Sequence, residues 1–177
     1  MAFTEPMTFS AGAVLTASQM NTYVRDNVDF LSEPPRALAY HNTTQSISTA
    51  TETIMACNSE EYDSDTMHDP STNNERLTAS TAGTYLLNGA CAFASGYTGR
   101  FFIYLKSTGG GGHTAILDHH CSAGGSQPQG MVGGTIALAA AEYAWISVYQ
   151  ESGGALNITS GATNRAGASI AATWIGE

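Results

Sequence analysis

From residue 36 onward the sequence repeats one pattern, in which short runs of alternating apolar and polar residues are separated by glycine-rich turns. The run Tyr143–Glu151 is the clearest: its odd positions begin with Tyr, Trp, Ser and Tyr, whereas its even positions carry Ala, Ile, Val and Gln. Turns such as Gly109–Gly112 and Gly153–Gly154 join the runs without an intervening helix, which predicts an all-β sandwich or barrel. The predicted strands are Arg36–His41, Glu52–Cys57, Gly83–Ala94, Gly99–Thr108, His113–His120, Gly130–Leu138, Tyr143–Glu151 and Ala168–Gly176.

One short N-terminal helix is predicted over residues 16–31, before the strands begin. Thr16 and Gln19 match a capping box, in which each side chain satisfies a free backbone amide of the first turn. Side chains at spacings of three and four then form a stripe typical of a seam between helices, where the amide of Asn27 would fix the register of identical helices. An amphipathic helix packed on its own domain is an equally good interpretation. The predicted seam consists of Ala17, Met20, Val24, Asn27 and Leu31.

The segment Glu33-Pro34-Pro35 divides the chain into two parts. Proline lacks a backbone amide and restricts the residue before it, so the helix has to end here. We therefore expect residues 1–35 to form an arm and helix that serve as an anchor, and residues 36–177 to form one globular domain.

The charge balance excludes two classes of partner. The chain has 6 basic and 15 acidic residues and a formal net charge of -9, whereas nucleic acids and anionic membranes attract clustered Lys and Arg. No apolar run approaches the roughly 20 residues of a membrane span, and the first residues lack the basic start of a secretion signal. We therefore expect synthesis in a cytoplasm, no nucleic acid and no membrane insertion. Only 12% of residues are charged, which favours a surface that is covered by further copies.

The stretch Glu60–Phe93 has the most specific pattern in the chain. An acidic, Asn-rich turn leads through Arg76-Leu77-Thr78 and Ala82-Gly83-Thr84-Tyr85-Leu86 into a long apolar strand. This order resembles the signature of the complement-type globular-head and tumour necrosis factor-like jelly rolls, and Ser169–Ile175 resembles their closing strand. The resemblance implies an antiparallel jelly-roll sandwich of about eight to ten strands. It also implies that Gly83 allows a tight start of the strand and that Tyr85 packs in the core.

The N-terminal segment Leu15–Asn27 resembles a leader common in bacteriophage structural proteins that carry such jelly rolls. Together with the jelly-roll resemblance, it implies a homotrimer on a phage particle. Family trimers meet along a face rich in aromatic and small apolar side chains, although each aromatic here could also belong to the core. The candidate interface residues are Met20, Val24, Asn27, Leu31, Tyr104, Tyr143, Trp145 and Tyr149.

Metal and catalytic chemistry find little support in the sequence. The acidic cluster of residues 60–69 supplies oxygen ligands that suit Ca²⁺, but its spacing departs from the EF-hand pattern, and a solvated turn with Asx-type hydrogen bonds is the favoured interpretation. Cys57, Cys91 and Cys121 lack zinc-ligand spacing and are expected to be reduced, buried thiols. No GxSxG motif is present, and Gly109–Gly112 precedes a strand and not a helix. We predict no catalytic residue, no metal and no cofactor.

Two functional hypotheses follow. The first is a non-enzymatic virion structural protein: a trimeric capsid decoration or head-fibre knob on the virion surface, bound to the major capsid protein or to tail proteins through its N-terminal segment. The alternative is a tail-fibre or tail-tip module that recognises a host cell-surface glycan through exposed loops. Its candidate residues are Asp63, Asp65 and Tyr97, together with the Gly109–Gly112 loop.

Overall fold

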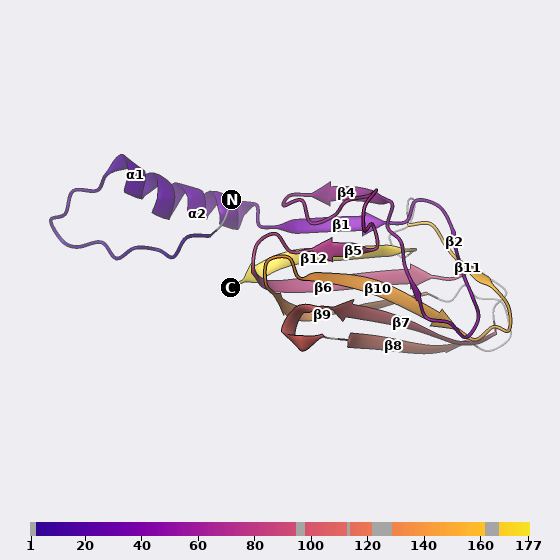
Figure 1. Ribbon diagram of the computed structural model, residues 1–177. Coiled ribbons are helices and arrows are strands. Elements are labelled where there is room, and N and C mark those ends of the chain that lie inside the picture. Colours follow the sequence, from indigo (N-terminus) through magenta and orange to yellow (C-terminus); the bar gives the residue numbers. More distant parts are fainter. Residues whose placement is uncertain (1–2, 95–97, 113, 122–128, 162–166) are drawn as a thin grey trace.

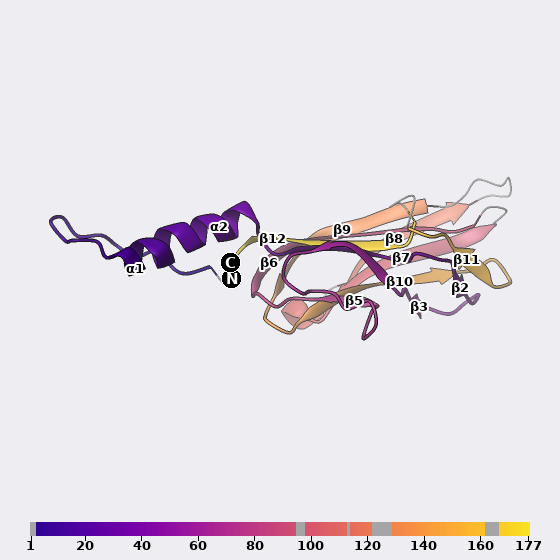
Figure 2. The ribbon, with the colours of Figure 1, turned by 90° about the horizontal axis from the view of Figure 1, so that it is seen from above.

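The computed structural model describes residues 3–94, 98–112, 114–121, 129–161 and 167–177, and of residues 114–121 it gives the backbone. The chain forms a β-sandwich with a helical extension that projects from one end along the long axis (Figures 1 and 2). Both described chain ends lie where the extension meets the sandwich (Figure 1).

The first sheet has the order β4-β1-β12-β6-β9, and all of its neighbouring strands are antiparallel. Its strands are β4 (Ser59–Asp63), β1 (Arg36–Tyr40), β12 (Ser169–Gly176), β6 (Gly83–Ala92) and β9 (Gln129–Leu138). Strands from the beginning, middle and end of the chain are therefore side by side, as a jelly roll requires.

The second sheet has the order β3-β10-β7-β8, and a further strand, β5, also pairs with β10. Its strands are β3 (Thr53–Ile54), β10 (Tyr143–Gln150), β7 (Gly99–Ser107), β8 (Thr114–Cys121) and β5 (Arg76–Thr78). A small separate pair, β2 (Gln45–Ile47) and β11 (Leu156–Ile158), lies at the far end, and a 3₁₀ turn (Gly109–Gly111) precedes β8. The predicted all-β sandwich with one N-terminal helical segment is confirmed.

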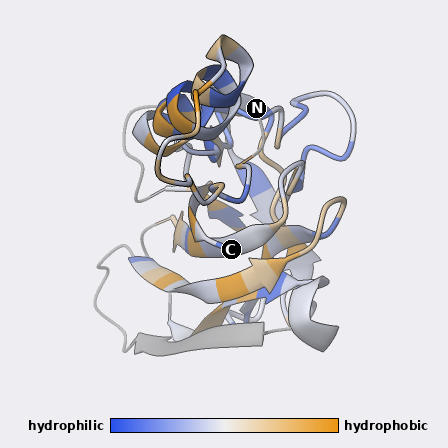
Figure 3. Cartoon of the chain, turned by 90° about the vertical axis from the view of Figure 1, so that its left-hand side faces the viewer, coloured by the Kyte–Doolittle hydropathy of each residue, from blue (hydrophilic) through white to orange (hydrophobic). Residues whose placement is uncertain are grey.

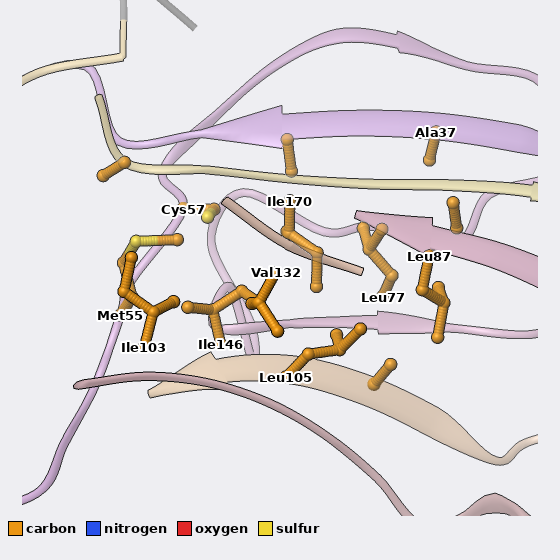
Figure 4. Packing of buried hydrophobic residues seen from close by; sticks show 14 of the residues in the cluster. Ala37, Met55, Cys57, Leu77, Leu87, Ile103, Leu105, Val132, Ile146 and Ile170 are labelled. Atoms are coloured by element: carbon orange, nitrogen blue, oxygen red, sulfur yellow. The ribbon is translucent and has the colours of Figure 1, made fainter. Parts of the chain in front are cut away.

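The core lies between the two sheets and follows the alternation expected from the sequence. Ile170 and Leu87 of the first sheet point toward Ile146 and Leu105 of the second (Figure 4). Gly89 allows this approach, because a Cβ at this position would lie 2.0 Å from Cδ1 of Ile146. Packing of this kind supplies most of the free energy that favours folding.

The start of β6 confirms what the family resemblance implied. Gly83 has a φ of +149°, and a Cβ there would lie 2.1 Å from Nε1 of Trp174, so only glycine fits. Tyr85 is fully buried, and its hydroxyl donates to the carbonyl of Thr81 at 2.6 Å. Burial, reinforced by the charge of Asp65, raises the pKa of Tyr85 to about 12.

Two predictions in residues 52–69 were wrong. The predicted strand Glu52–Cys57 is reduced to β3, because the amide of Met55 makes the last bond to β10 and the amide of Cys57 donates instead to the carbonyl of Asn74. The first half of the acidic turn is instead the strand β4, which pairs with β1 at an edge of the first sheet. An edge strand keeps its side chains in solvent, so charged residues are compatible with it.

The helical extension consists of α1 (Ala17–Met20), a π-helical turn (Asn21–Arg25) and α2 (Asp26–Ser32). The predicted capping box of Thr16 and Gln19 is present. The arm before the helix runs along it to the far tip and returns as α1 (Figure 1). Phe30 fixes the base of the extension, because its ring packs edge-on against Trp174 at 4.9 Å and near Phe3 at 6.1 Å. Within the described ranges, no helix combines the length and the apolar content needed to cross a membrane.

Candidate interaction surfaces

The helical extension exposes a stripe of apolar side chains. Met20, Val24, Val28 and Leu31 are all exposed, Val28 to 58% and Leu31 to 57%. Figure 3, which views the molecule from the helical end, shows apolar patches along the helix. The sandwich does not cover these side chains, because the extension projects beyond it (Figure 2). Exposed apolar stripes of this kind are typical of surfaces that contact another protein.

Asn27 differs from the other predicted seam residues. It is buried, and its amide oxygen accepts from the backbone N–H of Thr4 while its amide nitrogen donates to the carbonyls of Thr4 and Tyr23. The amide therefore holds the arm against the helix within one chain. The reason is the π-helical turn, which inserts an extra residue and rotates the following helix, so that Val28 takes the outward position that heptad counting gives to Asn27.

The outward face of the first sheet is formed by small and apolar side chains. Leu38, Ala171, Asn88 and Gly133 face one another across β1, β12, β6 and β9, and Ala90 faces Met131 in the adjacent row. Met131 is 66% exposed and Leu86 is 41% exposed, and Met131 lines a shallow hollow of about 130 Å³ together with Leu38, Asn88, Ala90 and Ala171. The residues of this small-residue face, none of them charged, are Leu38, Leu86, Asn88, Ala90, Met131, Gly133 and Ala171.

The outward face of the second sheet is aromatic. Phe102 lies 6.0 Å from Tyr104 and 5.7 Å from Tyr149, and Tyr143 lies 5.5 Å from Trp145, all between ring centroids. All five side chains are partly exposed, and they define the aromatic face: Phe102, Tyr104, Tyr143, Trp145 and Tyr149. The structure thus gathers the four aromatic interface candidates on one face, far from the helical candidates, and adds Phe102, whose place follows from its spacing of two from Tyr104.

Each of three cations on this face lies over an aromatic ring. Arg76 lies 4.2 Å from the ring centroid of Tyr143, Arg100 lies 4.8 Å from that of Phe102, and Lys106 lies 5.1 Å from that of Tyr104. Such stacking is favourable because the ring face is electron-rich. These are three of the six Lys and Arg residues of a chain whose net charge is -9. The aromatic face therefore carries more positive charge than the rest of this acidic molecule.

Carboxylates border the aromatic face. Glu52 forms an ion pair with Lys106 and accepts a hydrogen bond from Ser147. Partial burial raises the pKa of Glu52, but the hydrogen bonds from Lys106 and Ser147 and the charge of Lys106 outweigh it and lower the pKa overall. Tyr149 donates to Glu151 at 3.1 Å, and partial desolvation together with this carboxylate raises the pKa of Tyr149.

A pocket of about 180 Å³ opens beside Arg76, under the loop that follows β4. Most of its lining residues are polar, among them Thr72, Thr78 and Asn73. The Nε of Arg76 is buried and has no hydrogen-bond partner among the described residues. The lining residues are Thr66, Met67, His68, Asp69, Thr72, Asn73, Arg76 and Thr78.

The acidic loop forms its own hydrogen bonds. Asp63 accepts from the amides of Asp65 and His68, and Asp69 accepts from the amides of Ser71 and Thr72, which lowers the pKa of Asp69. These are Asx-type turns, as the favoured interpretation predicted. Across the part of the chain that the structure describes, no three His, Cys, Asp or Glu side chains converge as a metal-binding group. Tyr97, the third loop candidate, lies outside the described residues.

Two of the three cysteines are buried, as predicted. Cys57 and Cys91 are free thiols with no exposed surface. Burial raises the pKa of Cys57 to about 12, and burial together with nearby Cys57 raises the pKa of Cys91. Such thiols stay protonated and unreactive at neutral pH. The side chain of Cys121 lies outside the described residues.

Comparisons with known proteins identify the fold of the sandwich. No family model matches the chain, and no curated protein matches it. Among solved structures, the globular domain of zebrafish complement 1qA protein matches with a TM-score of 0.55 at 14% identity, over 80% of this chain and 97% of that one. Eiger TNF from S. frugiperda matches with a TM-score of 0.54 at 12% identity, over 81% and 94% of the two chains. Murine APRIL at pH 8.5 matches with a TM-score of 0.53 at 11% identity, over 79% and 99%. The sandwich therefore has the complement C1q and tumour necrosis factor-like jelly-roll fold.

Proposed function

We propose that this chain is a non-enzymatic structural protein of a bacteriophage virion, a homotrimeric knob attached to the particle surface by its helical extension. The observation that carries the proposal is the uncovered apolar stripe of Met20, Val24, Val28 and Leu31 on an extension that leaves the sandwich. The resemblance of Leu15–Asn27 to a phage leader supports a capsid or tail protein as the partner of this stripe. A compact single knob on a short chain favours a capsid decoration or head fibre.

The small-residue face is the better candidate for the threefold contact. Small side chains allow sheets of neighbouring copies to approach closely, and the charged residue of this face, Arg36, lies at the start of β1 rather than in the rows of Asn88 and Ala90. The aromatic face carries Arg76, Arg100 and Lys106, whose burial would cost free energy unless each found a partner. The alternative trimer contact stays a prediction: it would use the aromatic candidates Tyr104, Tyr143, Trp145 and Tyr149. Charged or polar substitutions on the two faces, compared by the mass in solution, distinguish the two contacts.

The attachment is tested with Val28→Asp in the full chain. A charge in the middle of the stripe should abolish binding to particles that lack this protein, because the carboxylate cannot be buried against an apolar partner. Binding is measured by co-sedimentation with the particles, and light scattering should still give a threefold mass. Asp29→Asn, on the neighbouring exposed position, is the matched control and should bind normally. Full attachment of the Val28→Asp protein would contradict the anchor.

A second candidate function is a tail-fibre or tail-tip module that recognises a host cell-surface glycan. The observation in its favour is the aromatic face, whose partly exposed rings lie beside cations and a polar pocket. The number of copies per particle separates the two functions, because a decoration protein is present in many copies and a tail tip in few. Quantitative mass spectrometry of purified particles measures this number.

A further inference from the structure

The surroundings of Trp145 on the aromatic face have the chemistry of a ligand site. Trp145 stands directly opposite Arg76 of β5 on one side and directly opposite Lys106 of β7 on the other. A partly exposed indole ring is therefore flanked by two cations from neighbouring strands, within the side-chain reach of a cross-strand pair. Glu52, which pairs with Lys106, is the carboxylate on this side.

A row of polar and aromatic groups continues from this point. On the far side of Arg76 lies the 180 Å³ pocket with the hydroxyls of Thr72 and Thr78. The ring of Tyr104, two residues from Lys106 along β7, lies under the ammonium group of Lys106. Polar pocket residues, two cations and partly exposed aromatic rings therefore lie next to one another on this face.

We infer that this row binds an acidic polysaccharide, with Arg76 holding the carboxylate of a uronic-acid-type sugar and Trp145 stacking on a sugar ring. The apolar C–H face of a sugar packs on an aromatic ring, and the planar guanidinium of Arg matches a carboxylate in a two-point contact. Arg76 lines the 180 Å³ pocket, so its guanidinium is placed to meet a carboxylate that enters there. The hydroxyls and amide of the pocket match sugar hydroxyls.

Charge density favours a uronic-acid polysaccharide over a nucleic acid as the ligand of this face. Three cations lie on this face of an otherwise acidic chain, and because Lys106 is paired with Glu52, Arg76 supplies the local attraction for an anionic group beside Trp145. A phosphodiester chain has a much higher charge density and would meet the overall charge of -9, whereas a polyuronate carries one spaced charge per sugar. The inference does not depend on whether the knob belongs to the capsid or to the tail.

The test uses the full chain and sodium polygalacturonate as the probe, with dextran as the neutral comparison and single-stranded DNA as the competing polyanion. Binding is followed by tryptophan fluorescence and by calorimetry. Trp145 is partly exposed whereas Trp174 is only 7% exposed, so the fluorescence change should disappear in Trp145→Phe. We expect binding of polygalacturonate, weaker binding at high salt, and no binding of dextran.

Substitutions locate the site. Arg76→Gln should weaken binding about tenfold or more, since a hydrogen bond to a charged group is lost, and Arg76→Lys should recover only part of it. Arg100→Gln is the matched control, because Arg100 also stacks on a ring of the same face but lies away from Trp145. It should bind almost as wild type. Melting curves confirm that each variant is folded.

Three outcomes would overturn the inference: no binding of polygalacturonate, an equal loss in Arg76→Gln and Arg100→Gln, or equal binding of DNA. The last would identify a nucleic-acid surface of stacking rings instead. The mass in solution is measured on the same samples, and Arg76→Gln should keep the wild-type mass. A failed ligand site is thereby distinguished from a failed trimer.

Discussion

The two outward faces of the sandwich follow the same alternation of buried and exposed residues, yet they present different chemistry. The face of β1, β12, β6 and β9 consists mostly of small and apolar residues, and its charged residue Arg36 lies at the start of β1, in one row with Thr173 and Leu86. The face of β10 and β7 carries five aromatic rings, over which three cations lie. The two sheets therefore present two different surfaces, one mostly of small and apolar residues and one of aromatic rings with three cations.

The largest effect is expected in the core that both faces share. Leu87→Ala should lower the free energy of unfolding by about 2–5 kcal/mol, because Leu87 is fully buried between the sheets. Its neighbour Leu86 points outward, so Leu86→Ala should cost about 0.5 kcal/mol or less in a monomer and more in an assembled protein. Urea unfolding at low and high protein concentration measures both values. A Leu86→Ala loss that is independent of concentration would argue against contact between copies at this face.

The next prediction separates the two faces as trimer contacts. Met131→Glu should convert a threefold mass into a single one, since it places a carboxylate in an uncharged contact while leaving the exposed site of the single chain unstrained. Light scattering coupled to size exclusion measures the mass. Tyr104→Ser, on the aromatic face, should keep the threefold mass. The opposite pair of results would assign the contact to the aromatic face, as the sequence-based candidates suggest.

The smallest effect concerns the carboxylate at the edge of the aromatic face. Because folding lowers the pKa of Glu52, its ion pair contributes stability above the ordinary value of 4.5, and this contribution is lost as the pH falls through the lower folded pKa. Glu52→Gln should cost up to about 1 kcal/mol at neutral pH, a small value because the pair is partly exposed, and almost nothing in strong acid. Urea unfolding at both pH values checks this, with Glu5→Gln in the exposed arm as control. An equal loss at both pH values would show that Glu52 acts through packing.

Much of the fold follows from local patterns, because strands of eight or more residues show their alternation clearly. The strands β2, β4, β5 and β11 were missed for a physical reason: three to five residues are too few to define a period, and β4 is an edge strand with mostly exposed side chains. The π-helical turn was also missed, since no residue type specifies it, and it moved Asn27 out of the predicted seam.

The surfaces were predictable only in part. Alternation correctly placed Tyr143, Trp145 and Tyr149 on one side of their strand. It could not show that Arg76 and Lys106 flank Trp145, because that depends on the register of three strands that are distant in sequence. The small-residue face was overlooked because Ala and Gly give little signal in a sequence, although spacing-two positions such as Met131 and Gly133 mark it.

The direction in which the helical extension leaves the sandwich has a mechanical consequence. The extension continues the long axis of the molecule and joins β1, which runs along that axis between β12 and β4 (Figure 1). A pull on the extension therefore acts along β1, and the hydrogen bonds to both neighbours, which lie across the strand, are loaded together in shear. Bonds loaded together break at a higher force than bonds opened one after another. A knob held by its extension is thus suited to resist tension, such as fluid drag or a tethered cell would exert.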